Sequence, residues 1–354
     1  MAEHYSNLKF LAYPDQLKAL NEKRVVAPIH VRIKPINHCN HDCWYCAYRV
    51  SNLQLGEKMD LKDRIPDEKM DEIVDDLIDM DVKAVTFSGG GEPLLYKQLP
   101  RHIETLSRAG IQVASLTNGA NLQGRMAEAF AEYGTWVRIS LDAWDDASYA
   151  KSRSLEDGCF TTLLKNLKDF SALKSSCVLG TSFIVTQENH SHLFDVCRAL
   201  KECGVSHVKV ASAVISNDGA ENNLYHRSIA KTVGDEIERA HSLSGNGFSI
   251  INHYHETEER FTKEYTTCPY LQFLTVIGAD CNVYTCQDKA YSDGGILGSI
   301  SERSFKEMWF ADDTRQRMYA IDPSKMCTHH CVTHAKNVVL SEILALDPDH
   351  LAFV

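Results

Sequence analysis

Apolar residues along the first two thirds of the chain alternate between strand-like and helix-like spacing. In 29–36, Ile29, Val31 and Ile33 recur at every second position, which indicates a half-buried strand. In 70–78 the apolar positions follow the helical period instead. Further strands are expected at 82–88, 111–117, 136–142, 177–186 and 207–212. Further helices are expected at 99–109, 122–133, 160–173, 191–203 and within 224–243. The chain is therefore predicted to be α/β, with six βα units.

Such alternation predicts a parallel sheet with right-handed crossovers. An eight-unit barrel would need more chain, so a partial barrel or an open doubly wound sheet is expected. Several strands are apolar on one face only, and the opposite faces carry His30, Arg32, Lys34, Arg138 and Lys209. An open sheet covered on both sides would be apolar on both faces. The pattern favours a partial (β/α)6 TIM-like barrel with a polar lumen, and solvated edge strands are the alternative.

The alternation stops near residue 246, where the expected elements become short. Strands are expected at 270–277 and 283–287 and one helix at 305–320, around a group of cysteines. We expect an N-terminal extension at 1–27, a barrel core at 28–245 and a small cysteine-rich domain at 246–354. The junction is placed in the Ser- and Gly-rich segment 242–246.

Composition narrows the class of protein. The 354 residues carry 37 Lys and Arg against 48 Asp and Glu, a net charge of −11, which argues against a nucleic-acid binder. No apolar run approaches a membrane span, and the first residues are too polar for a secretion signal, so a cytoplasmic location is expected. Twelve cysteines in a cytoplasmic chain predict metal binding more than disulfides.

Three of these cysteines form a compact motif, Cys39-x3-Cys43-x2-Cys46, with Tyr45 before the third. Three thiolates on one loop can hold three corners of a cubane iron–sulfur cluster and leave the fourth iron open to a small molecule. A zinc site is the alternative, in which His38 or His41 would supply the fourth ligand.

Small and polar residues follow the expected second, third and fourth strands. The second ends in Gly89-Gly90-Gly91-Glu92-Pro93, whose bare backbone a ligand can approach closely. The third ends in Thr117-Asn118-Gly119 and the fourth contains Ser140-Leu141-Asp142. The carboxyl ends of parallel strands gather at one mouth of a barrel, where ligands bind.

Together, the cysteine triplet and these three segments resemble the radical S-adenosylmethionine superfamily over residues 28–245. The resemblance implies that Cys39, Cys43 and Cys46 ligate a [4Fe–4S] cluster whose open iron chelates S-adenosylmethionine. One electron, from an external donor of the flavodoxin or ferredoxin type, would cleave the sulfonium to a 5′-deoxyadenosyl radical that abstracts hydrogen from a substrate. The residues implied to contact or support S-adenosylmethionine are Tyr45 (adenine), Gly90 and Gly91 (methionyl amine), Glu92 (brace of the glycine turn), Ser140 (methionyl or ribose group) and Thr117 (cofactor or substrate).

The C-terminal cysteines resemble the SPASM/twitch extension found in this superfamily. Only five cysteines lie in 268–331, which fits the single auxiliary [4Fe–4S] cluster of the twitch form. The ligands implied are Cys268, Cys286, Cys327 and Cys331, with Cys281 as second choice. Zinc is again the alternative, with His329, His330 and His334 as further candidate ligands. The isolated Cys159, Cys177, Cys197 and Cys203 are given no role.

These features predict an enzyme acting on a small polar substrate (a sugar, cyclitol or nucleotide), by oxidation, dehydrogenation or epimerisation with electron transfer through the auxiliary cluster. The inward cations suit an anionic or polyhydroxylated ligand. A peptide or protein maturase is the alternative, although the residues before Cys39 are too few for a leader-binding domain. A non-enzymatic zinc protein is a third possibility. No proton acceptor is defined; His30, Lys209 and Asp218 are suggested only by position.

Overall fold

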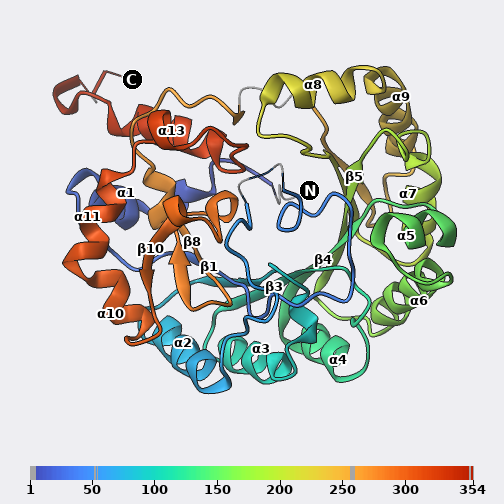
Figure 1. Cartoon of the computed structure of the whole chain (residues 1–354), viewed down its shortest axis with the longest axis horizontal. Coiled ribbons are helices and arrows are strands. Elements are labelled where there is room, and N and C mark those ends of the chain that lie inside the picture. Colours follow the sequence, from blue (N-terminus) through green and yellow to red (C-terminus); the bar gives the residue numbers. More distant parts are fainter. Residues whose placement is uncertain (1–4, 52, 54, 256–259, 351, 354) are drawn as a thin grey trace.

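A computed structural model describes residues 5–51, 53, 55–255, 260–350, 352 and 353. Its centre is one ten-stranded sheet in the order β10-β9-β8-β1-β2-β3-β4-β5-β6-β7. The strands from β8 through β1 to β7 all run parallel to one another. Beyond β8, strands β9 and β10 continue the sheet with antiparallel pairing. The sheet curves into an arc with most of the helices along its outer side (Figure 1). This arrangement confirms the predicted α/β partial barrel.

The strands are β1 (His30–Ile33), β2 (Ala84–Phe87), β3 (Gln112–Thr117), β4 (Gly134–Leu141), β5 (Val178–Val185), β6 (His207–Ser212), β7 (Ser249–His253), β8 (Leu274–Ile277), β9 (Asn282–Tyr284) and β10 (Ile296–Ser299). The α-helices are α1 (Pro14–Asn21), α2 (Asp67–Asp79), α3 (Leu99–Arg108), α4 (Gly124–Tyr133), α5 (Asp146–Arg153), α6 (Cys159–Ala172), α7 (Leu193–Glu202), α8 (Gly219–Arg227), α9 (Ala230–His241), α10 (Phe305–Phe310), α11 (Asp312–Ala320), α12 (Pro323–Met326) and α13 (His334–Leu344). Short 3₁₀ helices include η1 (Lys9–Ala12), η2 (Pro93–Leu95) and η4 (Pro269–Gln272).

The parallel sheet extends further than the sequence pattern indicated. Strand β7 lies beyond residue 246 and pairs in parallel with β6, so the prediction that the alternation stops there is wrong. Strand β8 pairs in parallel with β1, which joins the cysteine-rich region to the same sheet. Strand β8 lies within the strand predicted at 270–277, but its place beside β1 was not predicted. Strand β7 has only five residues, three of them polar, so its sequence gave no clear period. The boundary at 245 stays a prediction.

Two helical predictions also need correction, and one helix near the site was not predicted. The helix expected within 224–243 is two helices, α8 and α9, and the one expected at 305–320 is α10 followed by α11. Helix α5 was not predicted, although a capping box starts it: the Asp145 carboxylate accepts from the Ser148 amide, and the Ser148 hydroxyl accepts from the Asp145 amide.

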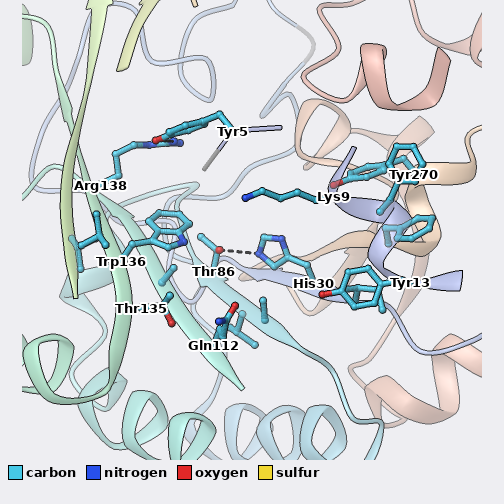
Figure 2. Close-up of a pocket in the computed structure, with 18 of the residues that line it drawn as sticks. Tyr5, Lys9, Tyr13, His30, Thr86, Gln112, Thr135, Trp136, Arg138 and Tyr270 are labelled. Atoms are coloured by element: carbon cyan, nitrogen blue, oxygen red, sulfur yellow. Dashed lines mark hydrogen bonds between the residues drawn. The ribbon is translucent and has the colours of Figure 1, made fainter. Parts of the chain in front are cut away.

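The strand faces follow the predicted alternation. Val31, Val137 and Val208 face outward and are fully buried in the main hydrophobic core. The opposite positions line the lumen, as Figure 2 shows for His30 and Arg138. No helix in the described part of the chain is long and apolar enough to cross a membrane.

Candidate functional site

The three cysteines of the triplet lie on the loop that follows β1, at the carboxyl end of the sheet. A turn brings Cys43 and Cys46 together, since the Cys46 amide donates to the Cys43 carbonyl over 3.1 Å. All three thiols are half-buried and line one cavity of about 340 Å³. In the described residues, no three His, Cys, Asp or Glu side chains converge on a single metal-ion position. A cubane makes a different demand, because each iron takes its own thiolate.

The same cavity collects the other predicted cofactor-binding residues. Tyr45 comes from the cysteine loop, Gly90 and Gly91 from the end of β2, Thr117 from β3 and Ser140 from β4. The structure therefore brings together side chains that are about a hundred residues apart in sequence. A cavity lined by three thiols and a glycine turn suits an iron–sulfur cluster that binds a small cofactor.

Burial disfavours thiolate charge in this loop. It raises the pKa of Cys43 to about 11, with a partial counter-effect from the nearby Arg153 guanidinium. It also raises the pKa of Cys39 and Cys46, where Arg49 acts in the opposite direction. Thiolates at these positions need a cationic partner, and bound iron would supply it.

The glycine turn packs directly against the cysteine loop. A Cβ atom on Gly91 would lie 2.0 Å from the His38 carbonyl oxygen, and one on Gly90 would lie 2.2 Å from Asn37 Oδ1. The Gly91 amide donates to the Ile36 carbonyl over 3.2 Å. Gly91 is therefore required for the close approach of two backbones, and Gly90 leaves room for the Asn37 side chain, in addition to any contact with a ligand.

Glu92 links the segment after β2 to the end of β3. Its buried carboxylate accepts from the Leu94 amide (3.0 Å), the Asn118 amide (2.8 Å) and the Thr117 hydroxyl (2.6 Å). Burial nevertheless raises its pKa, because desolvation outweighs the three hydrogen bonds. Thr117 lines the cavity, but its hydroxyl is held by Glu92 and also accepts from the Gly119 amide.

Arg153 is the residue that sequence reasoning missed. It lies at the end of α5, is 1% exposed, and pairs with Asp142 over 2.8 Å. Its Nη2 donates to the Tyr45 hydroxyl and to the Ser140 carbonyl, each over 2.9 Å. One guanidinium thus fixes two of the predicted cofactor contacts. The signal in the sequence was Asp142, a carboxylate directly after a buried strand that needs a partner.

These residues can be compared with known proteins. The sequence model of the Radical SAM superfamily matches residues 33–215, slightly more than half of the chain. The chain belongs to the radical SAM superfamily. Proteins of this superfamily are enzymes that use a [4Fe–4S] cluster and S-adenosylmethionine, as the resemblance had implied. Which residues of this chain hold them stays a prediction.

Two relatives and one solved structure illustrate the similarity. The chain is 29% identical over 113 residues to the S-adenosylmethionine-dependent nucleotide dehydratase of Lacinutrix mariniflava, a match covering 32% of this chain and 23% of that protein. It is 23% identical over 301 residues to the Fe-coproporphyrin III synthase of Methanosarcina barkeri, covering 77% and 71%. The crystal structure of Streptococcus suis SuiB bound to precursor peptide SuiA aligns with 94% of this chain and 78% of that one, with a TM-score of 0.63 and 15% identity, a likeness of fold alone.

The C-terminal cysteines form a second group. Cys268, Cys286, Cys327 and Cys331 line one small cavity, although they come from three separate segments. Cys281 lies apart from them, buried in the hydrophobic core. Burial raises the pKa of all four grouped thiols, to about 12 for Cys268. Repulsion from neighbouring thiols adds to this for Cys268, Cys286 and Cys327, and repulsion from Asp288 adds to it for Cys331. Four thiols around one cavity suit an iron–sulfur cluster, and His329, which borders the same cavity, is the further ligand that the zinc alternative would use.

The polar side chains suggested by the sequence differ in their hydrogen-bond partners and surroundings. Lys34 Nζ donates to the Tyr48 hydroxyl (2.6 Å) and the Gly89 carbonyl (2.5 Å), so it supports the site from within the protein. His30 shares a hydrogen bond with Thr86, and Asp218 caps α8. Lys209 projects from β6 toward Tyr5, its Nζ 5.8 Å from the ring centre.

Proposed function

We propose that the chain is a radical SAM enzyme that acts on a small anionic substrate, a sugar, cyclitol or nucleotide derivative, by oxidation, dehydrogenation or epimerisation. The observation that carries this proposal is an excess of positive charge in the lumen. Arg32, Arg138 and Lys209 project inward from β1, β4 and β6, and Arg138 also lines the cavity that holds the cysteine triplet.

These cations are incompletely partnered. The Nε atoms of Arg32 and Arg138 are buried and have no hydrogen-bond partner among the described residues. Burial, followed by repulsion from Arg138, Arg260 and Arg32, lowers the pKa of Lys209 to about 7. Asp288 offsets part of the repulsion felt by Arg32. A phosphate or carboxylate in the lumen would accept the free N–H groups and relieve the repulsion.

Residues of the chain would hold the cofactor through the contacts already described. Cys39, Cys43 and Cys46 would ligate the cluster, and the carbonyls of Gly90 and Gly91 would receive the methionyl amine. When bound, the cluster and S-adenosylmethionine supply a 5′-deoxyadenosyl radical that removes a hydrogen atom. Arg153 would keep Tyr45 beside the adenine, and Glu92 would keep the glycine turn in place.

We assign Cys268, Cys286, Cys327 and Cys331 to an auxiliary [4Fe–4S] cluster, within a twitch-like domain at 246–354 that follows the barrel core at 28–245. Such a cluster would supply a one-electron acceptor for the substrate radical, which favours oxidation over redox-neutral chemistry. The electrons for radical formation would come from a flavodoxin or ferredoxin in the cytoplasm.

The similarity to a protein named as a nucleotide dehydratase supports a nucleotide-type substrate, although it covers only a third of this chain. The likeness to SuiB with its precursor peptide concerns the fold, and so it keeps a peptide maturase as the second candidate. The incompletely partnered arginines favour the small anion, because a compact multiply charged group can engage all of the inward cations at once.

The test is formation of 5′-deoxyadenosine by the anaerobically reconstituted enzyme, measured with sugar phosphates, nucleotides, neutral sugars and short peptides. Phosphorylated sugars or nucleotides are expected to raise the rate above the substrate-free background. Arg138→Gln should raise KM for them by about tenfold or more, because a charge-assisted hydrogen bond is lost. Stimulation by peptides alone, or by neutral sugars as strongly as by their phosphates, would contradict the proposal.

A further inference from the structure

A second cavity lies in the lumen toward the amino ends of the strands, away from the cysteine loop. Its volume is about 500 Å³, and its floor is formed by the first inward residues of β1 to β6, including His30, Ala84 and Gln112. The N-terminal segment that carries Tyr5, Lys9 and Tyr13 covers it (Figure 2). This volume lies within the range of small-molecule sites.

The cavity exists because the inward residues here are small. Bulky branched side chains normally fill the lumen of a TIM barrel in layers. On β2 and β3, the inward positions at this depth are Ala84, Thr86 and Ala114. The sheet register places Thr86 beside Ala114 and Ala114 beside Trp136, so two small residues lie in one row with a single large ring.

Aromatic rings supply much of the wall. Trp136 projects from β4 on one side of the cavity, with Tyr5 above it, and Tyr13 and Tyr270 lie on the opposite side (Figure 2). Aromatic walls favour a planar ring as ligand, because such a ring can stack on Trp136.

The polar groups in this cavity favour negative charge. None of the described residues that line it is Asp or Glu, whereas Lys9 and Arg138 both reach it. The Arg138 Nη1 donates to the Tyr5 hydroxyl over 3.3 Å, but its buried Nε lacks a partner among the described residues. Gln112 adds an amide at the floor, and His30 is committed to Thr86 over 2.8 Å.

We propose that this cavity is a binding site for a planar aromatic ring that bears an anionic group, either a carboxylate or a phosphate. The ring would stack on Trp136, and the anion would accept from Arg138. The site lies at the opposite end of the lumen from the cysteine loop, and Arg138 reaches both cavities. Binding here goes beyond the proposed reaction, since it requires no turnover.

The experiment is equilibrium dialysis of the anaerobically reconstituted protein with two matched pairs of probes. Indole-3-acetate is compared with indole-3-acetamide, and uridine 5′-monophosphate with uridine, so that each pair differs in its anionic group. S-adenosylmethionine binding is measured in the same samples. At least one anionic probe is expected to bind about tenfold or more tightly than its neutral partner, and which one does so distinguishes carboxylate from phosphate.

Two variants test whether the probe binds in this cavity. Ala114→Phe should fill it and abolish probe binding, and Trp136→Leu should weaken binding by about tenfold, with S-adenosylmethionine binding unchanged in both. Trp144→Leu is the matched control, because that ring stacks on His192 outside the cavity. If Ala114→Phe also loses S-adenosylmethionine binding, that variant is misfolded, and the probe affinity of Trp136→Leu then tests the proposal. Failure of all four probes to bind, or wild-type probe affinity in Trp136→Leu, would overturn the proposal.

Discussion

Arg153 forms a buried ion pair with Asp142 at 2.8 Å, with both side chains 1% exposed. The same guanidinium donates to the hydroxyl of Tyr45 on the cysteine loop and to the main-chain carbonyl of Ser140 on β4. The guanidinium carbon of Arg153 also lies over the aromatic ring of Tyr149, 4.9 Å from the ring centroid. The pair therefore joins α5, β4 and the loop that carries the triplet, and it fixes the orientation of that loop relative to the sheet.

Replacing Arg153 with Met should destabilise the protein by about 3–5 kcal/mol, because Asp142 would be left as an uncompensated buried charge. The free energy of unfolding from urea titration measures this loss. The double variant Arg153→Met with Asp142→Leu removes both charges and should lose clearly less. An Arg153→Met variant that unfolds at the same urea concentration as the wild type would show that the pair does not support the loop.

The residues of the candidate site were largely predictable because its chemistry lies in short motifs. Three closely spaced cysteines and a glycine turn after a strand can be recognised without knowing how strands pair. The parallel order of strands then places the two segments at the same mouth of the barrel, as the cavity shared by Cys39 and Gly90 shows. The polar lumen was predictable for a similar reason, since Arg32 and Arg138 alternate with buried aliphatic residues.

Features that depend on tertiary pairing were not predictable. Strand β7 is only Ser249–His253, and its assignment comes from hydrogen bonds with β6 rather than from its own pattern. Arg153 lies in a polar stretch of sequence in which a charged side chain is expected to be exposed, and only tertiary packing buries it. Likewise, Cys281 and Cys286 have similar sequence surroundings, but only Cys286 points into the cavity with the other three thiols.

Gly91 should not tolerate even a methyl group. In Gly91→Ala, the new Cβ would lie 2.0 Å from the backbone oxygen of His38, so the cysteine loop must move. We expect a loss of about 1–3 kcal/mol of stability and at least about a tenfold weaker affinity for S-adenosylmethionine. Gly234→Ala is the matched control, because nothing lies within 4 Å of its Cβ position in α9. That control should gain about 0.5–1 kcal/mol. Equal affinity in both variants would show that the close approach is unimportant.

The triplet should be essential for radical formation. Separate changes of Cys39, Cys43 and Cys46 to Ala should abolish reductive cleavage of S-adenosylmethionine, because the cluster loses one of its three protein ligands. The measurement is 5′-deoxyadenosine produced with dithionite as reductant. Cys203→Ala is the control, since this half-buried thiol lies at the end of α7 and outside both cysteine groups. Substantial 5′-deoxyadenosine from any triplet variant would exclude that cysteine as a ligand.

His30 should make the fold less stable in acid. Burial, together with Arg32, lowers its pKa from 6.5 to about 3, so the folded protein holds it neutral at pH values where the unfolded chain protonates it. Its contribution is therefore fully present above pH 6.5 and is lost as the pH falls toward 3. Between pH 7.5 and 5.0, the wild type should lose up to about 2 kcal/mol that His30→Gln retains. Urea titrations at both pH values measure the difference, and the exposed His241→Gln serves as control. A constant difference between wild type and His30→Gln would contradict the buried neutral state.

The auxiliary cysteines should separate radical formation from product formation. Cys268→Ala with Cys286→Ala removes two thiols from the second group and leaves the cofactor cavity intact. Iron should fall from about eight to about four atoms per chain, since one of two cubanes is lost. Cleavage of S-adenosylmethionine should persist at a reduced rate, whereas formation of product from the substrate found in the screen should stop. Cys281→Ala is the matched control, because its thiol lies in the core, and it should retain about eight irons. Full turnover by the double variant would rule out a role for this group in electron transfer, and zinc without iron in the wild type would rule out the cluster itself.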